Sequence, residues 1–444
     1  MREGEVVTVV GGGLAGCEVA LQLGRRGVPV RLIEMKPVER TPAQVSDRLA
    51  ELVCSNSFRS DELHSAIGLL KWEMRHAGSA IMAAADEAAV PAGAALAVDR
   101  ERFSDAIEQE IERCPSIERI TGRADEIPEG LSVICTGPLT APKLAAAVAA
   151  RAGQESLYFY DAIAPIIDAE SIDWSIAWRQ SRHDKGEGAD YANLPMSEAQ
   201  YYAFVEAVNA AEKVTPRAFE EAKYFEGCLP IEVMAERGPL TLAYGPLKPI
   251  GLKDPRSEDA PFAVVQLRME NLAATAWNMV GFQTRLKYPE QRRIFRTIPG
   301  LEGAEFLRYG SIHRNTYLNA PALLSEGLHW HDDPDLYFAG QITGVEGYVE
   351  STACGLLVAW QLLARLRGVE LTPPPTTCAM GALRRHLRGD GILGDYAPSN
   401  LNWSFFDPID KRRREKRREK RLRLSERARG ALQEWWATWG ERLS

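Results

Sequence analysis

The sequence predicts an α/β protein in which a Rossmann-like domain of the glutathione-reductase type is interrupted by a mixed α+β insertion. Three observations predict it. A strand, a glycine-rich turn, a helix and a second strand follow one another over residues 6–35. A strand, a glycine-rich turn and an apolar helix return over residues 334–366. Between them, residues 151–305 mix aromatic, proline and charged residues without a second glycine-rich βαβ pattern, so the first and last parts are expected to share one sheet.

The N-terminal βαβ unit is the best-defined element. We expect a strand at 6–10, a turn at 11–16, a helix from about residue 17 to 25 and a strand at 28–35. A longer helix is expected from about residue 60 to 85, because Ser60, Asp61 and Glu62 have the composition of a helix cap and first turn. Residues 132–139 are expected to form another strand that ends in a tight turn.

The first glycine-rich turn predicts a dinucleotide site. Gly11, Gly13 and Gly16 fit the pattern GxGxxG directly after a strand and at the start of a helix. The first glycine permits the turn, the second admits a pyrophosphate to the helix N-terminus, and the third lets the helix pack on the strand. Glu34 ends the second strand, where a carboxylate can accept ribose hydroxyls. The candidate binding residues are Gly11, Gly12, Gly13, Leu14, Ala15, Gly16 and Glu34.

The choice between FAD and NAD does not follow from this motif alone. The later run YFAGQITGVEGY (residues 337–348) is similar to the second flavin-contacting segment of two-dinucleotide flavoproteins. We therefore expect FAD as the bound cofactor, with Gly340, Gln341, Gly344 and Gly347 beside it.

These observations divide the chain of 444 residues into four segments. Residues 1–150 are expected to form the first part of the FAD-binding domain, 151–305 the insertion, and 306–371 the return segment. A proline-rich linker at 372–377 then leads into a basic, helix-prone tail that runs to residue 444.

The cysteines indicate a reducing compartment. Seven are present, with no CxxC pair and no metal-finger spacing, so we expect free thiols, a cytoplasmic protein and no metal site. The missing CxxC pair also argues against a pyridine-nucleotide disulfide reductase. Cys17, Cys135 and Cys354 are expected to be core residues, because they lie in apolar strand and helix segments.

Two other cysteines are candidates for chemistry. Cys228 precedes Leu229 and Pro230; if Pro230 is the first helical residue, the thiol lies near the positive end of a helix, which favours the thiolate. Cys54 lies in the polar run VCSNS. From the residues alone, a packing role stays equally open for each.

The charge of the C-terminal tail and of the whole chain indicates what kind of partner the protein binds. The net charge is −8, yet residues 411–427 carry a large excess of arginine and lysine. One interpretation is a solvated helix held by i,i+4 ion pairs and docked by Trp435, Trp436 and Trp439; the other is contact with a phosphate backbone. No apolar run reaches the roughly 20 residues that span a bilayer, so no membrane association is expected.

Several ordered runs resemble the TrmFO family of folate- and FAD-dependent tRNA (uracil-5-)-methyltransferases, relatives of the GidA/MnmG flavoproteins. They include GGGLAGCEVA, LVCSNSFRS, GLLKWEMR, GCLPIEVMAERG and YFAGQITGVEGYVES. The resemblance implies that NAD(P)H reduces FAD, and that 5,10-methylenetetrahydrofolate passes a methylene through flavin N5 to C5 of the uridine at T-loop position 54 of tRNA. It also implies that Cys228 attacks C6 of the uracil, and that Cys54 acts as a base or organises the flavin.

The same resemblance leaves two alternatives open. One is the same chemistry on ribosomal RNA, and the other is an RNA-binding flavoprotein without catalysis. We expect a monomer that binds the tRNA T-arm without an obligatory protein partner.

Overall fold

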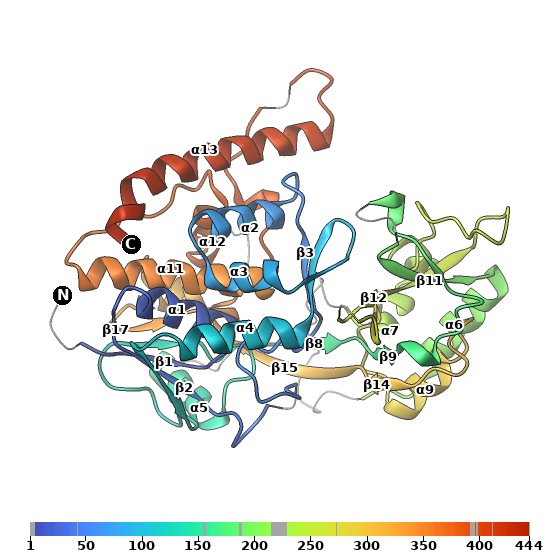
Figure 1. Cartoon of the computed structure of the whole chain (residues 1–444), viewed down its shortest axis with the longest axis horizontal. Coiled ribbons are helices and arrows are strands. Elements are labelled where there is room, and N and C mark those ends of the chain that lie inside the picture. Colours follow the sequence, from blue (N-terminus) through green and yellow to red (C-terminus); the bar gives the residue numbers. More distant parts are fainter. Residues whose placement is uncertain are drawn as a thin grey trace.

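The first sheet of the computed structural model is Rossmann-like, as the sequence predicts (Figure 1). Its strand order among the described residues is β16-β17-β7-β1-β2-β6. The central strand β1 (Val7–Val10) is buried along its whole length and pairs in parallel with β2 (Val30–Glu34) and β7 (Ser132–Ile134). The parallel strands β6 (Ile117–Thr121) and β17 (Asp333–Phe338) extend the sheet on either side, and β16 (His329–Trp330) is antiparallel to β17. Strands from both ends of the chain therefore form one sheet, which confirms the predicted fold class.

The structure describes residues 5–41, 43–153, 157–185, 189–214, 229–271, 273–390, 396, 398–410 and 412–443.

The helices of this domain differ in detail from the predicted ones. Helix α1 (Leu14–Gly24) starts three residues earlier than expected, because Gly13 already serves as its N-cap. The single helix expected over residues 60–85 is wrong: α2 (Ala66–His76) and α3 (Ala80–Glu87) are separate. Gly78, with φ of +73°, interrupts the helical conformation between them. The cap of α2 is Ser65, whose hydroxyl accepts the Gly68 N–H at 3.0 Å.

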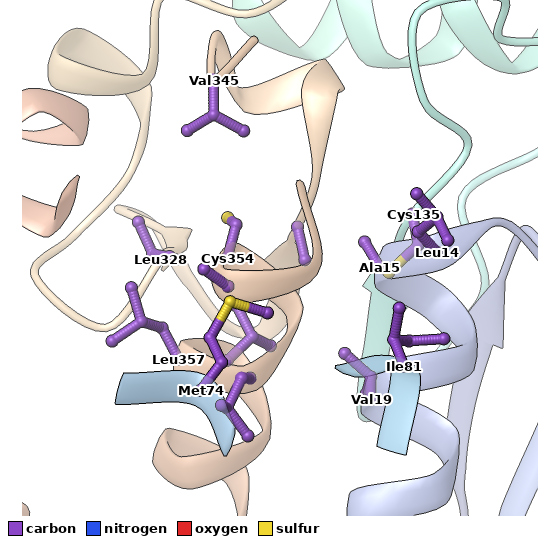
Figure 2. Close-up of a cluster of buried hydrophobic side chains, with 14 of the residues drawn as sticks. Leu14, Ala15, Val19, Met74, Ile81, Cys135, Leu328, Val345, Cys354 and Leu357 are labelled. Atoms are coloured by element: carbon purple, nitrogen blue, oxygen red, sulfur yellow. The ribbon is translucent and has the colours of Figure 1, made fainter. Parts of the chain in front are cut away.

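Helices α1 and α11 (Tyr348–Leu366) pack backbone against backbone. A Cβ atom on Gly355 would lie 2.6 Å from the carbonyl oxygen of Ala15, so only glycine allows this approach. Figure 2 shows Ala15 on α1 and Cys354 on α11 in the surrounding buried cluster, with Met74 of α2. The N-terminal βαβ unit and the return segment are thus held together at one helix pair.

The second sheet belongs to the insertion and is antiparallel throughout, with the order β10-β11-β12-β13-β9-β14. It has a buried cluster of its own, separate from the core of the first domain. The paired strands β8 (Leu157–Ile163) and β15 (Ser311–Tyr317) run between the two parts, as Figure 1 shows. The last strand of the second sheet, β14, ends at Arg308. The domain bounds expected from the sequence stay a prediction.

The elements of the insertion are β9 (Ile166–Asp168), η1 (Ala169–Ser171), β10 (Trp178–Arg179), η2 (Arg182–Asp184), β11 (Tyr191–Met196), α6 (Glu198–Ala210), α7 (Ile231–Glu236), α8 (Thr241–Tyr244), β12 (Ala263–Met269), β13 (Ala276–Met279), α9 (Tyr288–Phe295) and β14 (Phe306–Arg308). The remaining elements are β3 (Ser57–Ser60), β4 (Ala89–Val90), β5 (Ala95–Val98), α4 (Arg100–Glu112), α5 (Pro142–Ala152), α10 (Ala320–Leu323), η4 (Gln341–Thr343), α12 (Ala379–Leu387), η5 (Trp403–Phe405) and α13 (Arg417–Leu443).

The tail helix α13 is docked through its C-terminal half. The rings of Trp435 and Trp436 lie 5.1 and 5.4 Å from that of Trp360 on α11, and the Trp435 indole N–H donates to the carbonyl of Thr372 at 2.7 Å. This confirms the predicted docking role of the tryptophans. In the described chain, no helix combines the length and apolarity that crossing a membrane needs.

We predict that Gly355→Ala destabilises the protein, because its new methyl group meets the rigid backbone of α1. Overpacking costs about 1–3 kcal/mol, which exceeds the gain of about 1 kcal/mol that alanine brings to a helix interior. Gly430→Ala in α13 is the matched control, since a Cβ atom there would meet no heavy atom within 4 Å. In chemical denaturation, the free energy of unfolding should be lower than that of wild type for Gly355→Ala and equal to it or higher for Gly430→Ala. Equal stability of the two variants would contradict the close packing.

Candidate functional site

A cavity lies at the carboxyl ends of β1, β2 and β7. Its wall includes Gly11 and Gly13 from the first glycine turn and Gly340 and Gln341 from the second. Ligands of open α/β sheets bind at this edge, where successive strands send their connections to opposite faces. The fold thus brings both predicted glycine turns to a single site, although more than 300 residues separate them in sequence.

The three glycines of the first turn have different surroundings. Gly11 has φ of +103°, and a Cβ atom there would lie 2.6 Å from the carbonyl oxygen of Cys135. A Cβ on Gly16 would lie 1.9 Å from the carbonyl oxygen of Gly11. A Cβ on Gly13, by contrast, would meet no protein atom within 4 Å and would project at the cavity wall. Gly11 and Gly16 therefore make the turn possible, and Gly13 keeps the approach to the helix open.

The N-terminus of α1 supplies hydrogen-bond donors at this wall. Gly13 is its N-cap and brings no side-chain acceptor to the first turn. The first N–H groups of a helix lack acceptors within the helix and lie at its positive end. Leu14 and Ala15 line the cavity as well. The arrangement fits the pyrophosphate of a dinucleotide.

Glu34 lines the cavity and also holds the first turn in place. Its carboxylate accepts the N–H of Gly12 at 2.7 Å and the N–H of Lys36 at 3.0 Å. Gly12 itself faces Glu34 and Leu49 and does not belong to the cavity wall. The acid at the end of β2 thus has a structural role beside its predicted one.

In the second glycine turn, too, some residues line the cavity and others support the turn from behind. Gly340, with φ of +83°, packs against Ala15, and the Gln341 side chain donates to Glu346 at 2.6 Å. A Cβ on Gly344 would meet the ring of Tyr396 at 2.5 Å, and one on Gly347 would meet Glu350 at 2.6 Å. Four of the predicted residues therefore stand behind the cavity wall: Gly12, Gly16, Gly344 and Gly347.

The half-buried Cys54 lies beside a wall residue of the same cavity. Its backbone N–H donates to the phenol oxygen of Tyr348 at 2.7 Å, and the N–H of Ser55 donates to the same oxygen at 3.1 Å. Burial raises the pKa of Tyr348, and the adjacent Cys54 raises it further. Tyr348 is therefore a neutral phenol at physiological pH, and it fixes the position of the Cys54 loop.

Two arginines accompany this pair. Arg100 donates to the carboxylate of Glu270 at 2.5 Å and to the carbonyl of Leu52. Arg308 donates to the carbonyl of Ala43 at 3.3 Å, and burial together with Arg100 lowers its pKa. Because Glu270 follows β12 and Arg308 ends β14, the insertion contributes directly to the surroundings of Cys54.

Asn56 clamps the Cys54 loop between the two parts of the molecule. Its fully buried amide donates to the carbonyl of Val98 at 2.9 Å and to that of Met269 at 2.8 Å, and its oxygen accepts from Arg268 at 3.0 Å. Every polar atom of this amide is used on main chain or on a guanidinium. The run VCSNS is thus a fixed junction between the first domain and β12.

The other cysteines divide as expected. Cys17, Cys135 and Cys354 are buried, as are Cys114 and Cys378, and burial raises the pKa of the Cys354 thiol to about 11. Cys228 lies outside the described residues. Among those residues there is no group of three or more side chains of the kind that binds metal.

The helix after Cys228 starts later than predicted. Pro230 is the N-cap of α7 and not its first helical residue, since its carbonyl accepts the N–H of Met234 at 3.1 Å. The following Glu232 is fully buried and accepts from Thr284 at 2.8 Å and from the N–H of Arg285 at 2.9 Å. The segment is therefore anchored through the glutamate of the GCLPIE motif.

The sequence interpretation missed Tyr348, Arg100 and Arg308. Tyr348 lies in the run YFAGQITGVEGYVES, where it directly follows Gly347 at the end of the second glycine turn. A tyrosine that ends a glycine turn was the available signal. The pairing with Cys54, however, joins residues 294 positions apart and depends on the tertiary fold.

Comparison with known proteins agrees with this geometry. The sequence model of the family described as "Glucose inhibited division protein A" matches residues 6–370. The GidA structure from Aquifex aeolicus superimposes with a TM-score of 0.68 at 16% identity and covers 99% of this chain and 76% of that one, which shows the shared fold.

Two similar sequences are named methylenetetrahydrofolate--tRNA-(uracil-5-)-methyltransferase TrmFO. The protein from Myxococcus xanthus is 59% identical over 433 residues, covering 97% of this chain and 94% of its own. The protein from Geobacter sulfurreducens is 53% identical over 433 residues, covering 97% and 99%. Identity at this level over nearly the whole length, together with the family match, means that the chain belongs to the GidA family of flavoproteins, in its TrmFO branch.

Proposed function

We propose that this chain forms 5-methyluridine at T-loop position 54 of tRNA, taking the carbon from 5,10-methylenetetrahydrofolate, with FAD as cofactor and NAD(P)H as reductant. The observation that carries the proposal is the Cys54 loop, held by Tyr348 at the wall of a cavity that both glycine turns line. A nucleotide cradle and a half-buried thiol thus share one site. The named activity of the relatives supports the choice of donor and acceptor.

The first turn would hold FAD. The N–H groups of Leu14 and Ala15 would bind the pyrophosphate, Gly13 would leave it room, and Glu34, at the end of its strand, would accept the ribose hydroxyls. The bound flavin supplies redox and one-carbon chemistry. Gly340 and Gln341 close the cavity from the other side.

The uracil is activated by this chain's own side chains. C5 of uracil is a poor nucleophile, and a thiolate that adds to C6 makes C5 enolate-like. Cys228 is the proposed nucleophile, on the strength of the GCLPIE resemblance. Cys54 is the proposed base or flavin-organising thiol, and Arg308 is the cation placed near it for the negative charge that develops on the ring.

The exposed basic part of the tail is a proposed tRNA contact. Arg413, Arg414 and Arg417 are exposed, whereas Glu415 forms an ion pair with Arg423 at 2.6 Å. This ion pair joins residues eight positions apart, so it is not one of the i,i+4 pairs of the solvated-helix interpretation. The excess positive charge is left for phosphate groups.

The enzyme works in the cytoplasm as a monomer, without an obligatory protein partner. The free thiols among the described residues suit a reducing compartment.

Gly13→Ala is expected to fold normally and to lose FAD. The residue has φ of −78° and ψ of −171°, which alanine adopts readily, and its Cβ meets no protein atom. The methyl group would instead occupy the approach to the helix N-terminus. Flavin released per mole of purified protein, read by absorbance, should fall well below that of wild type, with Gly430→Ala as the control. Full flavin content in Gly13→Ala would mean that the first turn does not bind FAD.

The function itself is tested by incubating the protein with methylene-labelled 5,10-methylenetetrahydrofolate, NAD(P)H and RNA transcripts. Mass spectrometry should find labelled 5-methyluridine in tRNA only when donor and reductant are both present. Cys228→Ala should abolish the label while flavin stays bound. Label in ribosomal RNA in place of tRNA, or RNA binding without any label, would replace the proposal by one of the two alternatives.

Removing tail charge should weaken tRNA binding and flatten its salt dependence. Because Trp435 is buried against the body, whole-helix deletion would disturb the fold, so the triple change to glutamine at Arg413, Arg414 and Arg417 is preferred. Filter binding over a range of salt concentrations measures both effects. The control triple, with the same change of charge at exposed sites, is Arg31, Arg102 and Arg113. Equal salt slopes for the two triples would return the tail to a structural role.

A further inference from the structure

A hollow on the insertion, away from the glycine-lined cavity, combines two tyrosines with three arginines. It is lined by Tyr288, Pro289, Arg292, Arg293, Arg296 and Tyr309. Tyr288, Arg292 and Arg296 follow one another at intervals of four residues in and just after α9, so they share one face of the helix. The sequence interpretation assigned no role to these residues.

The aromatic part of the hollow is a stack of rings that reaches from the core into solvent. Phe306 packs near the fully buried Phe295, and Tyr309 stacks on Phe306 with ring centroids 5.1 Å apart. Tyr288 stacks on Tyr309 at 5.0 Å with an interplanar angle of 19°. Tyr288 is 55% exposed and ends a stack whose inner members, Phe306 and Tyr309, are half-buried, so much of its ring is open to solvent.

A buried amide fixes the geometry of this stack. Gln291 is fully buried; its side chain donates to the carbonyl of Gly310 at 2.9 Å and accepts the N–H of Gly310 at 2.8 Å. It also donates to the carbonyl of Leu286 at 2.6 Å. The residue after Tyr309 is thereby tied to α9, so the two tyrosines are held together before any ligand arrives.

The charged part of the hollow is only partly neutralised. Arg293 pairs with Glu290 at 2.5 Å, and Arg296 donates to the carbonyl of Ala304 at 3.0 and 2.7 Å. Arg292 is exposed, and no carboxylate of the described residues forms an ion pair with it. The hollow therefore keeps an excess of positive charge beside a flat ring.

Such a combination matches the chemistry of an unstacked nucleotide. Bases stack on exposed aromatic faces, and guanidinium groups meet the adjacent phosphates. An acidic peptide would use the charge and leave the rigid ring stack without a purpose. A single-stranded or splayed nucleotide uses both.

The hollow is also connected to the Cys54 site through adjacent residues. Arg308 is close enough to Tyr348 and Cys54 for these groups to oppose the lowering of its pKa by burial, and its sequence neighbour Tyr309 belongs to the hollow. One chain segment therefore takes part in both places. A nucleotide held on Tyr288 would position the rest of the same RNA relative to the cavity.

This inference rests on the tRNA substrate of the proposed function. We propose that the hollow binds a second, non-target nucleotide of the tRNA, with its base on Tyr288 and its phosphate on Arg292. The bound nucleotide holds the unfolded elbow while the target uridine enters the cavity. Such a loop base is free to stack once it leaves its tertiary contacts.

Binding of labelled tRNA to full-length holoenzyme variants tests the proposal. Tyr288→Ala and Arg292→Ala should each raise Kd by roughly tenfold, in line with the loss of one stacked base or one phosphate contact. Tyr288→Phe keeps the ring face and should bind like wild type. Arg113→Ala is the matched control, because the side chain of Arg113, the C-cap of α4, is 70% exposed. Unchanged Kd in both alanine variants would overturn the proposal.

Photo-crosslinking gives a readout that does not depend on variant folding. Wild-type enzyme with 4-thiouridine-substituted tRNA should yield a crosslinked peptide that contains Tyr288, and digestion should place the crosslink at a uridine other than the target. A crosslink to the target uridine, or none to this peptide, would contradict the inference. If wild type binds and crosslinks tRNA here but transfers no label, the proposed function fails and this inference stands.

Discussion

Helices α1 and α11 approach each other so closely that glycine is required at their contact. Gly355 lets the backbone of α11 reach the carbonyl of Ala15, and Gly340 packs against the side chain of the same residue. Because α1 follows the first glycine turn and α11 follows the second, this single contact sets both turns around one cavity. A bulkier residue at Gly355 would separate the helices and, with them, the two halves of the cradle.

Buried carboxylates extend this assembly to distant segments. Glu73 of α2 accepts the N–H groups of Ala379 and Met380 at the start of α12, at 2.7 and 2.8 Å. Glu350 of α11 accepts from Arg59 and from the N–H of Leu401. Burial raises the pKa of Glu73 to about 8, while the two N–H groups oppose that shift. Each of these buried glutamates accepts hydrogen bonds from main-chain N–H groups that water does not reach. The C-terminal segments are therefore joined to the first domain through polar contacts as well as through tryptophans.

Much of this fold could be predicted from the sequence, because local patterns encode it. The βαβ unit, both glycine turns and the buried Cys17 follow from periodicity and glycine spacing. The split of α2 from α3 was missed because Gly78 interrupts an otherwise helical composition. The partners of Cys54 were missed for a different reason: Tyr348 and Arg308 reach it only through sheet pairing and domain contact, and no local spacing records that. The ring stack on α9 likewise depends on Gln291 holding a segment that follows β14.

We propose that the glycine-lined cavity and the Cys54 loop together form one flavin site. A crystal structure of the protein with FAD tests it most directly. We expect density for the pyrophosphate at the Leu14 and Ala15 amides and for the flavin ring on the side of the cavity formed by Tyr348. Flavin bound elsewhere, or a ring far from the Cys54 loop, would contradict it.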